Sequence, residues 1–369
     1  MKIVIAPDKF KGSLTASEVC DIVQSELLSR SREFDIITLP LADGGEGTCE
    51  LLTELSNGRI IEVDVLDPLH RKIKSSYGIS GDGHTAFIEM AKASGLQLLK
   101  PIERNCTVTS TYGTGQLIRS ALEKNVTEIV MGIGGSATND AGLGMAKALG
   151  FQLYSRTGEE LKGIGADLTS LNDVDFSQAH EQIRHTKFIT LCDVKNPLYG
   201  PNGASFVFAK QKGASDKEMK MLDKGLQNFA AIASQLNCDV NFPGAGAAGG
   251  LGAGSKLFLN THIQSGTDFL INYTRLEERI KEADVVITGE GKLDIQTLSG
   301  KVMDGVATLA RRHNKKLIII AGSCELSKKQ IDQMGITQLI TLKDNNTSEV
   351  EAIEMAKDHL KIKAALIQM

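Results

Sequence analysis

Four short apolar runs, each followed by a loop of glycine and polar residues, mark the pattern of this chain. They are KIVIA at 2–6, EIVMG at 128–132, DVVIT at 284–288 and LIIIA at 317–321. Continuous apolar runs of this length are typical of parallel strands that are covered on both faces. Segments with helical spacing separate the runs, which indicates βαβ units and an α/β fold with a mainly parallel sheet.

A different pattern begins at residue 60, where two strand-like stretches flank Asp82-Gly83, a hairpin signal. Further strand-like runs follow at 187–194 and 204–209. We therefore predict two α/β domains, one Rossmann-like with a mainly parallel sheet and one smaller mixed-sheet domain inserted in it. The predicted bounds are 1–59 with 101–150 and 276–369 for the first domain, and 60–100 with 151–275 for the second.

Helical segments follow from the same patterning. Thr15 and Glu18 form a T-x-x-E capping box ahead of an apolar stripe on one face. Residues 211–236 indicate a long polar helix, and 348–369 have helical spacing as well. The glycine-dense stretch at 243–254 is a poor helix former, so the free-energy cost of its glycines must be offset by close packing or by contact with a ligand. The pattern leaves both explanations open.

The composition narrows the classes of partner. Lys and Arg total 41 against 45 Asp and Glu, which gives no support for nucleic-acid or membrane-surface binding. No apolar stretch approaches the roughly 18 residues of a membrane-spanning helix, and the first apolar run is too short for a signal peptide. The six cysteines include no C-x-x-C pair, which argues against a zinc site or a disulfide framework. We expect a cytoplasmic protein with reduced thiols, and its oligomeric state stays open.

The loop GIGGSATND at 132–140 is the first candidate site. Gly132, Gly134 and Ala137 fit G-x-G-x-x-A, a dinucleotide-binding pattern in which backbone N–H groups at a helix start face a phosphate. Arg156, in the next strand-like run, would suit a cofactor with a 2′-phosphate. A tight strand-to-helix turn without a ligand explains the same glycines.

A Walker-type triphosphate loop does not occur in the sequence. LSGKV at 298–302 contains Gly-Lys, but a valine replaces the following hydroxyl residue and the leading glycine is missing. Ser299 in this segment reads as a helix cap.

The remaining loops bring carboxylates to strand ends. In TGEGKLD, Glu290 and Asp294 are oxygen ligands of the kind that Mg²⁺ prefers, although acids in a solvated loop look the same. Asp43 precedes two glycines and a helix start, so it is either a chemical group or a helix cap. Asp193, in CDVKNPL, reads equally as a turn cap.

Taken together, these stretches resemble the successive motifs of a known family. The chain resembles the bacterial glycerate kinase family, the one often called type two, from Met1 to about Leu342. The blocks that carry the resemblance are APDKFKGSLTASE, LPLADGGEGT, GIGGSATNDAGLGMAKALG, CDVKNPLYGPNGAS with VFAKQKGA, PGAGAAGGLGAG and TGEGKLDIQTLSGK, in this order.

The resemblance implies ATP-dependent transfer of a phosphoryl group to D-glycerate, with Mg²⁺, in the cytoplasm and commonly with 2-phosphoglycerate as product. It also implies two α/β domains with the site in the cleft between them. A few positions depart from the family pattern. They are Lys9 where Ser is usual, Ala141 where Gly is usual, Lys292 where Arg is usual, and Ala209-Lys210 where Gly-Pro is usual. These changes alter charge and loop stiffness but remove no acid and no glycine loop.

The residues and the resemblance lead to a hypothetical set of roles. Gly134, Gly135, Ser136, Thr138 and Asp140 bind the nucleotide phosphates, and Asp8, Ser13, Gly44 and Gly45 bind glycerate. Glu290 and Asp294 hold Mg²⁺, Lys11 and Lys292 neutralise charge, and Asp43 is the first candidate for the general base with Asp193 the second.

Two other classes compete with this hypothesis. An NADP-dependent Rossmann oxidoreductase would use the same glycine loop and would bind NADPH. A non-catalytic protein that binds a small acid would take up glycerate without forming ADP, but such proteins normally carry an export signal.

Overall fold

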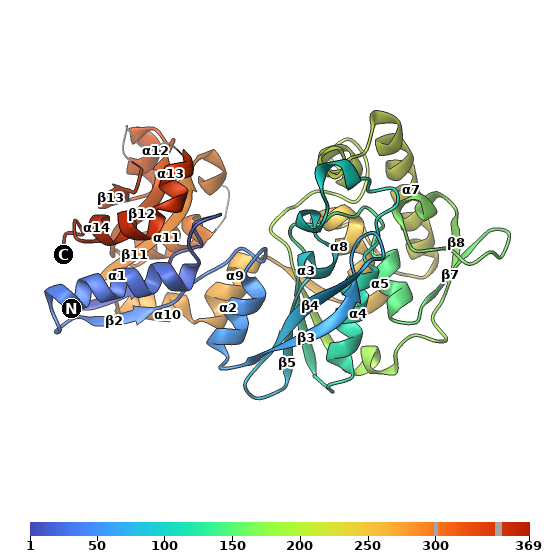
Figure 1. Cartoon of the computed structure of the whole chain (residues 1–369), viewed down its shortest axis with the longest axis horizontal. Coiled ribbons are helices and arrows are strands. Elements are labelled where there is room, and N and C mark those ends of the chain that lie inside the picture. The colour runs from blue at the N-terminus through green and yellow to red at the C-terminus, as the bar shows by residue number, and fades with distance from the viewer. Residues whose placement is uncertain (299–301, 344–348) are drawn as a thin grey trace. The chain divides into compact units, whose positions relative to one another are not determined.

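The computed structural model describes residues 1–298, 302–343 and 349–369, and it divides into two compact units (Figure 1). The first unit comprises Met1–Asp43 and Thr267–Met369, and the second comprises Gly44–Gly266. These bounds differ from the predicted ones. Residues 101–150, which the sequence assigned to the first domain, contain a strand that pairs on both sides with strands of the second unit. Long-range pairing places this strand, and local pattern does not encode it.

The first unit is built on a five-stranded sheet in the order β13-β12-β11-β1-β2, in which every neighbouring pair is parallel. Its strands are β1 (Lys2–Ile5), β2 (Asp35–Thr38), β11 (Val285–Leu293), β12 (Lys316–Cys324) and β13 (Gln338–Thr341). Its helices are α1 (Ala16–Arg30), α9 (Gly266–Tyr273), α10 (Leu276–Glu282), η6 (Ile295–Leu298), α11 (Val302–Arg312), α12 (Lys328–Gln333), α13 (Glu349–Glu354) and α14 (Ala356–Ala364).

Patterning explains the core of this unit. The apolar runs form strands whose central residues, such as Ile5 and Ile318, are completely buried, as expected for a parallel sheet covered on both faces. Helix α1 packs Val23 and Leu27 into the same core. The predicted capping box is confirmed, because the Thr15 side chain accepts from the Glu18 N–H while the Glu18 carboxylate accepts from the Thr15 N–H.

The second unit is built on a six-stranded mixed sheet in the order β10-β9-β6-β5-β4-β3. The first four strands run parallel, whereas β4 and β3 are antiparallel to their neighbours. The strands are β3 (Arg59–Leu66), β4 (Lys72–Ile79), β5 (Thr85–Glu89), β6 (Glu128–Gly132), β9 (Lys187–Leu191) and β10 (His262–Gln264), with a separate hairpin of β7 (Gln152–Ser155) and β8 (Leu171–Asp175). The predicted turn at Asp82-Gly83 does join β4 to β5, with Gly83 at φ 78°.

Helices surround this sheet, and one of them corrects a prediction. The run ASFVFA, predicted as a strand, forms helix α6, in which the Val207 N–H donates to the Gly203 carbonyl. The buried residues of the run are Ala204, Ser205 and Ala209, which do not alternate, so the segment lacks the period of a strand. The helices are α2 (Thr48–Leu55), α3 (Ala91–Ser94), α4 (Tyr112–Leu122), α5 (Leu143–Ala148), α6 (Ala204–Phe208), α7 (Asp216–Gln235) and α8 (Ala247–Leu259), with short 3₁₀ turns η1 (Leu96–Leu98), η2 (Pro101–Glu103), η3 (Gly165–Thr169), η4 (Glu181–His185) and η5 (Lys210–Lys212).

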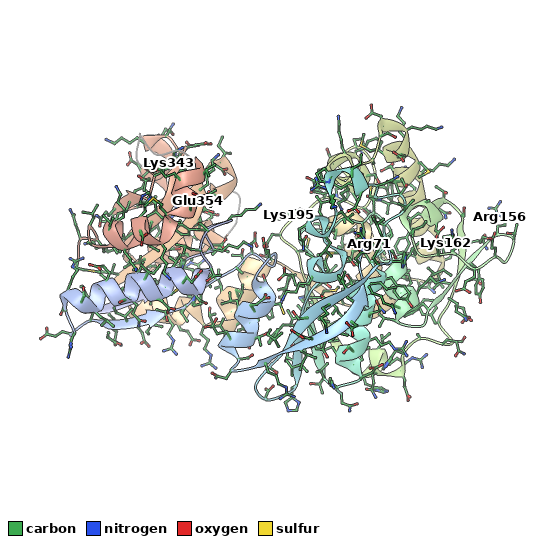
Figure 2. All side chains as sticks on the ribbon, viewed as in Figure 1. Arg71, Arg156, Lys162, Lys195, Lys343 and Glu354 are labelled. Carbon is green, nitrogen blue, oxygen red and sulfur yellow. The ribbon has the colours of Figure 1, made fainter. Side chains whose placement is uncertain are left out.

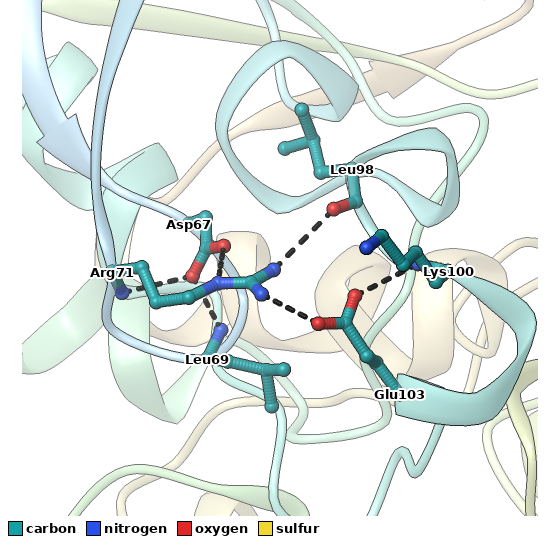
Figure 3. Close-up of polar contacts among 6 residues, drawn as sticks. All are labelled: Asp67, Leu69, Arg71, Leu98, Lys100 and Glu103. Carbon is teal, nitrogen blue, oxygen red and sulfur yellow. Dashed lines mark hydrogen bonds and ion pairs between the residues drawn. The ribbon is translucent and has the colours of Figure 1, made fainter.

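A charged network ties the connection between β3 and β4 to the segment before α4 (Figure 3). The Arg71 guanidinium donates to the buried carboxylate of Asp67 at 2.6 Å and to Glu103 at 2.7 Å. The Ser110 N–H donates to the Pro68 carbonyl at 3.0 Å. This connection therefore braces the segment just before α4, which contacts the glycine loop described below.

Candidate active site

Four parallel strands of the second unit end in one row. Pairing places Glu89 beside Gly132, Gly132 beside Leu191, and Leu191 beside Gln264. Ligands of open α/β sheets bind at the carboxyl ends of such strands, because the loops gather there. The glycine loop, Asp193 and the end of β5 all lie at this edge.

The glycine loop that follows β6 packs against the ADGGEGT block. A Cβ on Gly132 would lie 2.4 Å from the Gly44 carbonyl oxygen, and one on Gly134 would lie 3.1 Å from the Gly45 Cα. Gly135 adopts φ 77°, a conformation that favours glycine. The structure thus brings Gly132 and Gly134 together with Gly44 and Gly45. Gly134 and Gly135 keep their backbone exposed, whereas the residues that follow them are buried.

Asp140 anchors the far end of this loop. Its carboxylate is completely buried and accepts two hydrogen bonds from Thr111, from the backbone N–H and the hydroxyl, both at 2.8 Å. It also accepts from the N–H groups of Gly142 and Gly144, where α5 begins. Burial raises the pKa of this carboxyl, and the four hydrogen bonds oppose that rise. Asp140 therefore holds the backbone of the loop to α4 and α5.

Ser136 and Thr138 lie over a buried lysine that the sequence did not single out. Lys212, in η5, donates from Nζ to the Ser136 hydroxyl at 2.6 Å and to the Thr138 carbonyl at 2.8 Å. Within the described ranges, the buried Thr138 Oγ1 and Asn139 Oδ1 have no hydrogen-bond partner. The block VFAKQKGA contains this lysine, but nothing in its local pattern indicates burial.

The second glycine-dense block packs behind the loop. A Cβ on Gly249, which has φ 68°, would lie 2.1 Å from the Thr138 carbonyl oxygen. One on Gly254 would lie 2.0 Å from the Ala141 carbonyl oxygen, and the Ala141 N–H donates to the Gly249 carbonyl. At these positions the small residues serve close packing between α8 and the loop, which answers the question that the sequence left open.

Asp193 follows β9 and is held by the segment after β10. Its Oδ1 accepts from the Ser265 hydroxyl at 2.6 Å and from the Gly266 N–H at 3.1 Å. The neighbouring Cys192 N–H donates to the Gln264 carbonyl. The carboxylate is thereby fixed at the same sheet edge as the glycine loop.

Glu89, which the sequence analysis missed, ends β5 as a buried carboxyl. It accepts from the Gly47 N–H at 3.0 Å and so holds the turn that leads into α2. Burial, followed by the charge of Glu50, raises the pKa of Glu89 to about 7. An acid directly after the apolar run TAFI was the available signal.

In the first unit, acidic residues lie beyond the ends of β1 and β2 and in the last part of β11. Asp8 is 9% exposed, and its backbone N–H donates to the Gly289 carbonyl at 2.8 Å. Burial, then the charge of Asp43, raises the pKa of Asp8 to about 7, against an opposing hydrogen bond from the Lys9 N–H. The Lys9 ammonium lies 3.9 Å from Asp43, and Glu290 adds to the negative field at Asp8.

The two predicted metal ligands are linked through Thr297. The Thr297 hydroxyl donates to Glu290 Oε1 at 2.6 Å and accepts from the Asp294 N–H at 3.0 Å. Lys292, on the same strand, pairs with Glu325 at 2.8 Å. Among residues 1–298, 302–343 and 349–369, no three or more His, Cys, Asp or Glu side chains are arranged to hold a metal ion. Ser299, the predicted helix cap, lies outside these ranges.

The turn after β1 carries the other predicted substrate-side residues. The Ser13 hydroxyl donates to the Phe10 carbonyl at 3.0 Å, so its proton is engaged within the turn. Lys11 is exposed, and its backbone nitrogen would lie 3.1 Å from a Cβ on Gly291. The glycines of TGEGK thus let the turn approach β11 closely.

Arg156 does not fit the dinucleotide interpretation. It is exposed in the turn after β7 (Figure 2), and β7 pairs with β8 in a separate hairpin rather than beside β6 in the main sheet. In a dinucleotide-binding fold the corresponding residue ends a strand of the main sheet.

A surface cavity of about 560 Å³ lies in the second unit near the end of α7. None of the predicted site residues lines it. Its lining consists of Tyr199, Gln227, Ala230, Ala231, Ser234, Asn237, Cys238, Asp239, Val240 and Asn241. We therefore place the candidate chemistry at the strand ends and not in this cavity.

A family model described as "Glycerate kinase family" matches residues 3–368. The chain belongs to the glycerate kinase family. It is 42% identical over 366 residues to a glycerate kinase of Bacillus cereus, covering 99% of this chain and 96% of that protein. It is 43% identical over 362 residues to the glycerate 2-kinase of Escherichia coli, covering 98% and 95%.

A solved structure extends the likeness of this glycerate kinase family member to its fold. The crystal structure provisionally named glycerate kinase 2 from Salmonella typhimurium LT2 matches with a TM-score of 0.89 and 41% identity. The match covers 99% of this chain and 96% of that one. Within the described parts of the chain, no helix is both long and apolar enough to cross a membrane.

Proposed function

We propose that this chain transfers the γ-phosphoryl group of ATP to the 2-hydroxyl of D-glycerate. Membership of the glycerate kinase family supports the reaction, and the likeness to a protein named glycerate 2-kinase supports the choice of hydroxyl. The observation that carries the proposal is the exposed glycine pair, Gly134 and Gly135, at the carboxyl edge of the mixed sheet, with a buried lysine behind it.

The nucleotide phosphates bind at this loop in our proposal. The exposed backbone of Gly134 and Gly135 offers N–H donors, and the Ser136 hydroxyl lies beside them. Thr138 adds a buried hydroxyl without a protein partner among the described residues. Asp140 contributes indirectly, because its carboxylate already accepts four hydrogen bonds from the loop and its neighbours.

Mg²⁺ fits the acids of the first unit. Mg²⁺ is commonly held by one or two carboxylates together with substrate phosphates, so a cage made only of protein groups is not required. Glu290 and Asp294 are our proposed ligands, because the Thr297 hydroxyl donates to the Glu290 carboxylate and accepts from the backbone N–H of Asp294. Besides burial, the charges of Asp43 and Glu290 raise the pKa of Asp8, and this negative field favours a cation. Bound there, Mg²⁺ would offset phosphate charge.

In our proposal, residues that follow β1 and β2 act on glycerate, the acceptor of the phosphoryl group. Asp43 is our proposed general base, because it lies beside the Lys9 ammonium and within the field of a second carboxyl, Asp8. Asp193 stays the second candidate. Lys11 and Lys292 would neutralise developing charge, and Asp8, Ser13, Gly44 and Gly45 would bind glycerate.

We also propose a cytoplasmic location, because all six cysteines are free thiols.

The test is a coupled assay of ADP formation with ATP and Mg²⁺ against D-glycerate and a panel of other hydroxy acids and sugars. Phosphorus NMR of the product then identifies the modified hydroxyl. We expect D-glycerate to be preferred and 2-phosphoglycerate to form. Exclusive formation of 3-phosphoglycerate would correct the proposed hydroxyl, and purified protein that leaves glycerate unchanged would reject the function.

A further inference from the structure

Lys212 is a buried ammonium group whose direct contacts are neutral. The residue is 3% exposed, and its Nζ donates to the Ser136 hydroxyl and the Thr138 carbonyl. Burying an ammonium costs free energy that neutral acceptors offset only in part. A protein that needed only packing here would use an apolar side chain, so this charge calls for a functional explanation.

The direction of the first hydrogen bond is informative. Because Lys212 can only donate, the Ser136 oxygen accepts, and the hydroxyl proton of Ser136 is free to point elsewhere. Donation from a cation also polarises the hydroxyl and makes it a stronger donor. Ser136 directly follows the exposed pair Gly134 and Gly135.

We infer that Lys212 is a positioning residue for nucleotide binding: it holds the loop from Gly134 to Thr138 in shape and directs the Ser136 hydroxyl toward a phosphate oxygen. The inference rests on the proposed function, since it takes the ligand of this loop to be a nucleotide. Lys212 itself stays behind the loop and acts through Ser136 and the Thr138 carbonyl.

Two titratable groups face Lys212. Burial lowers the pKa of Lys212 to about 8, whereas the charge of Asp140 favours the ammonium form. Burial also raises the pKa of the Cys106 thiol to about 11, so this thiol stays neutral where Lys212 titrates. An anion on the loop favours the ammonium form, so nucleotide affinity should fall as the pH rises through about 8.

The first test compares Lys212→Met with Lys210→Met, a matched control from the exposed end of the same 3₁₀ turn. We expect Lys212→Met to raise KM for ATP roughly tenfold or more. The variant leaves the Ser136 hydroxyl and the Thr138 carbonyl without their donor, and the loss of one buried hydrogen-bond partner corresponds to roughly a tenfold change in an equilibrium constant. KM for glycerate should stay within about twofold. Amide hydrogen exchange of residues 134–140 should accelerate in Lys212→Met and not in Lys210→Met.

Ser136→Ala tests whether Lys212 affects ATP binding through the Ser136 hydroxyl. If Lys212 acts through this hydroxyl, the double variant should bind ATP about as weakly as Lys212→Met alone, whereas independent effects would multiply. Multiplying effects would overturn the inference, as would a folded Lys212→Met variant with unchanged KM for ATP and unchanged exchange.

A measurement on the unmodified protein covers the case in which Lys212→Met fails to fold. The Kd of a non-hydrolysable ATP analogue should weaken between about pH 7.5 and about pH 9.5. A flat profile would overturn the inference. Wild-type protein that binds the analogue but leaves glycerate unchanged would reject the proposed function alone. The hydrogen-exchange comparison and the analogue Kd of the Lys212 variants would still test the inference.

Discussion

The backbone N–H of Gly47 donates a hydrogen bond to the buried carboxylate of Glu89, 3.0 Å away, and so joins the end of β5 to the turn before α2. This turn carries Gly44 and Gly45, which pack on the glycine loop after β6. A single acidic side chain thereby supports the contact between two sequence blocks that lie about 90 residues apart.

Glu89→Gln should change the pH dependence of stability. Because the pKa of Glu89 is raised from 4.5 to about 7 in the folded protein, its contribution is present at low pH and is lost as the pH rises through about 7. At pH 8 the variant should therefore have a free energy of unfolding about 1–3 kcal/mol higher than that of wild type and should unfold at a higher urea concentration. Near pH 5 the two proteins should have similar stability. Urea unfolding at both pH values measures this. The exposed Glu62→Gln serves as control, and equal stability of Glu89→Gln and wild type at pH 8 would contradict the expectation.

Asp43→Asn should lower turnover far more than nucleotide binding. A general base typically contributes about 10²–10⁴-fold, and an amide cannot accept the proton. Steady-state kcat and the Kd of a non-hydrolysable ATP analogue separate the two effects. Asp35→Asn, an exposed change at the start of β2, should leave both unchanged. Near-normal kcat for Asp43→Asn would transfer the role to Asp193.

Gly132→Ala should disrupt the packing of the two glycine blocks. The added methyl group would lie 2.4 Å from the Gly44 carbonyl oxygen, so one backbone must move. We expect a loss of about 1–3 kcal/mol in unfolding free energy together with reduced activity. Gly158→Ala is the comparison, because it adds a methyl group to open space and incurs only about 1 kcal/mol of backbone strain. Thermal unfolding and kcat/KM measure both, and a Gly132→Ala protein as active and stable as wild type would refute the packing argument.

Glu290→Gln should weaken the use of Mg²⁺. Loss of the carboxylate charge removes a proposed ligand while the amide oxygen can still accept from Thr297. The Mg²⁺ concentration for half-maximal ADP formation should rise by about 10–100-fold, and chelation with EDTA should abolish activity. Glu282→Gln, an exposed acid of α10, should titrate like wild type. An unaltered Mg²⁺ titration of Glu290→Gln would place the ion elsewhere.

Much of the fold could be predicted because it depends on residues that lie close together in the sequence. Continuous apolar runs such as KIVIA and LIIIA marked buried parallel strands, and Asp82-Gly83 marked the turn between β4 and β5. Thr15 and Glu18 marked the start of α1. These signals involve residues within a few positions of one another, so the chain carries them without reference to its partners.

Membership of strands in sheets could not be predicted in the same way. The run EIVMG has the same continuous apolar pattern as the strands of the first unit, yet β6 pairs with β5 and β9 in the other sheet. The run ASFVFA has strand-like composition, yet it forms α6 against α7 and α8. In both cases contacts with distant segments outweigh local preference.

By itself, the sequence determined the α/β class, the strand-end glycine loops and the blocks that resemble the family, because short-range pattern and composition specify them. Only the tertiary structure decided that Asp140 anchors the loop, that Gly249 packs behind it, and that Lys212 lies buried under Ser136. The physical reason is that burial and hydrogen bonding depend on which distant segments meet, and residues 136 and 212 become neighbours only when the chain has folded.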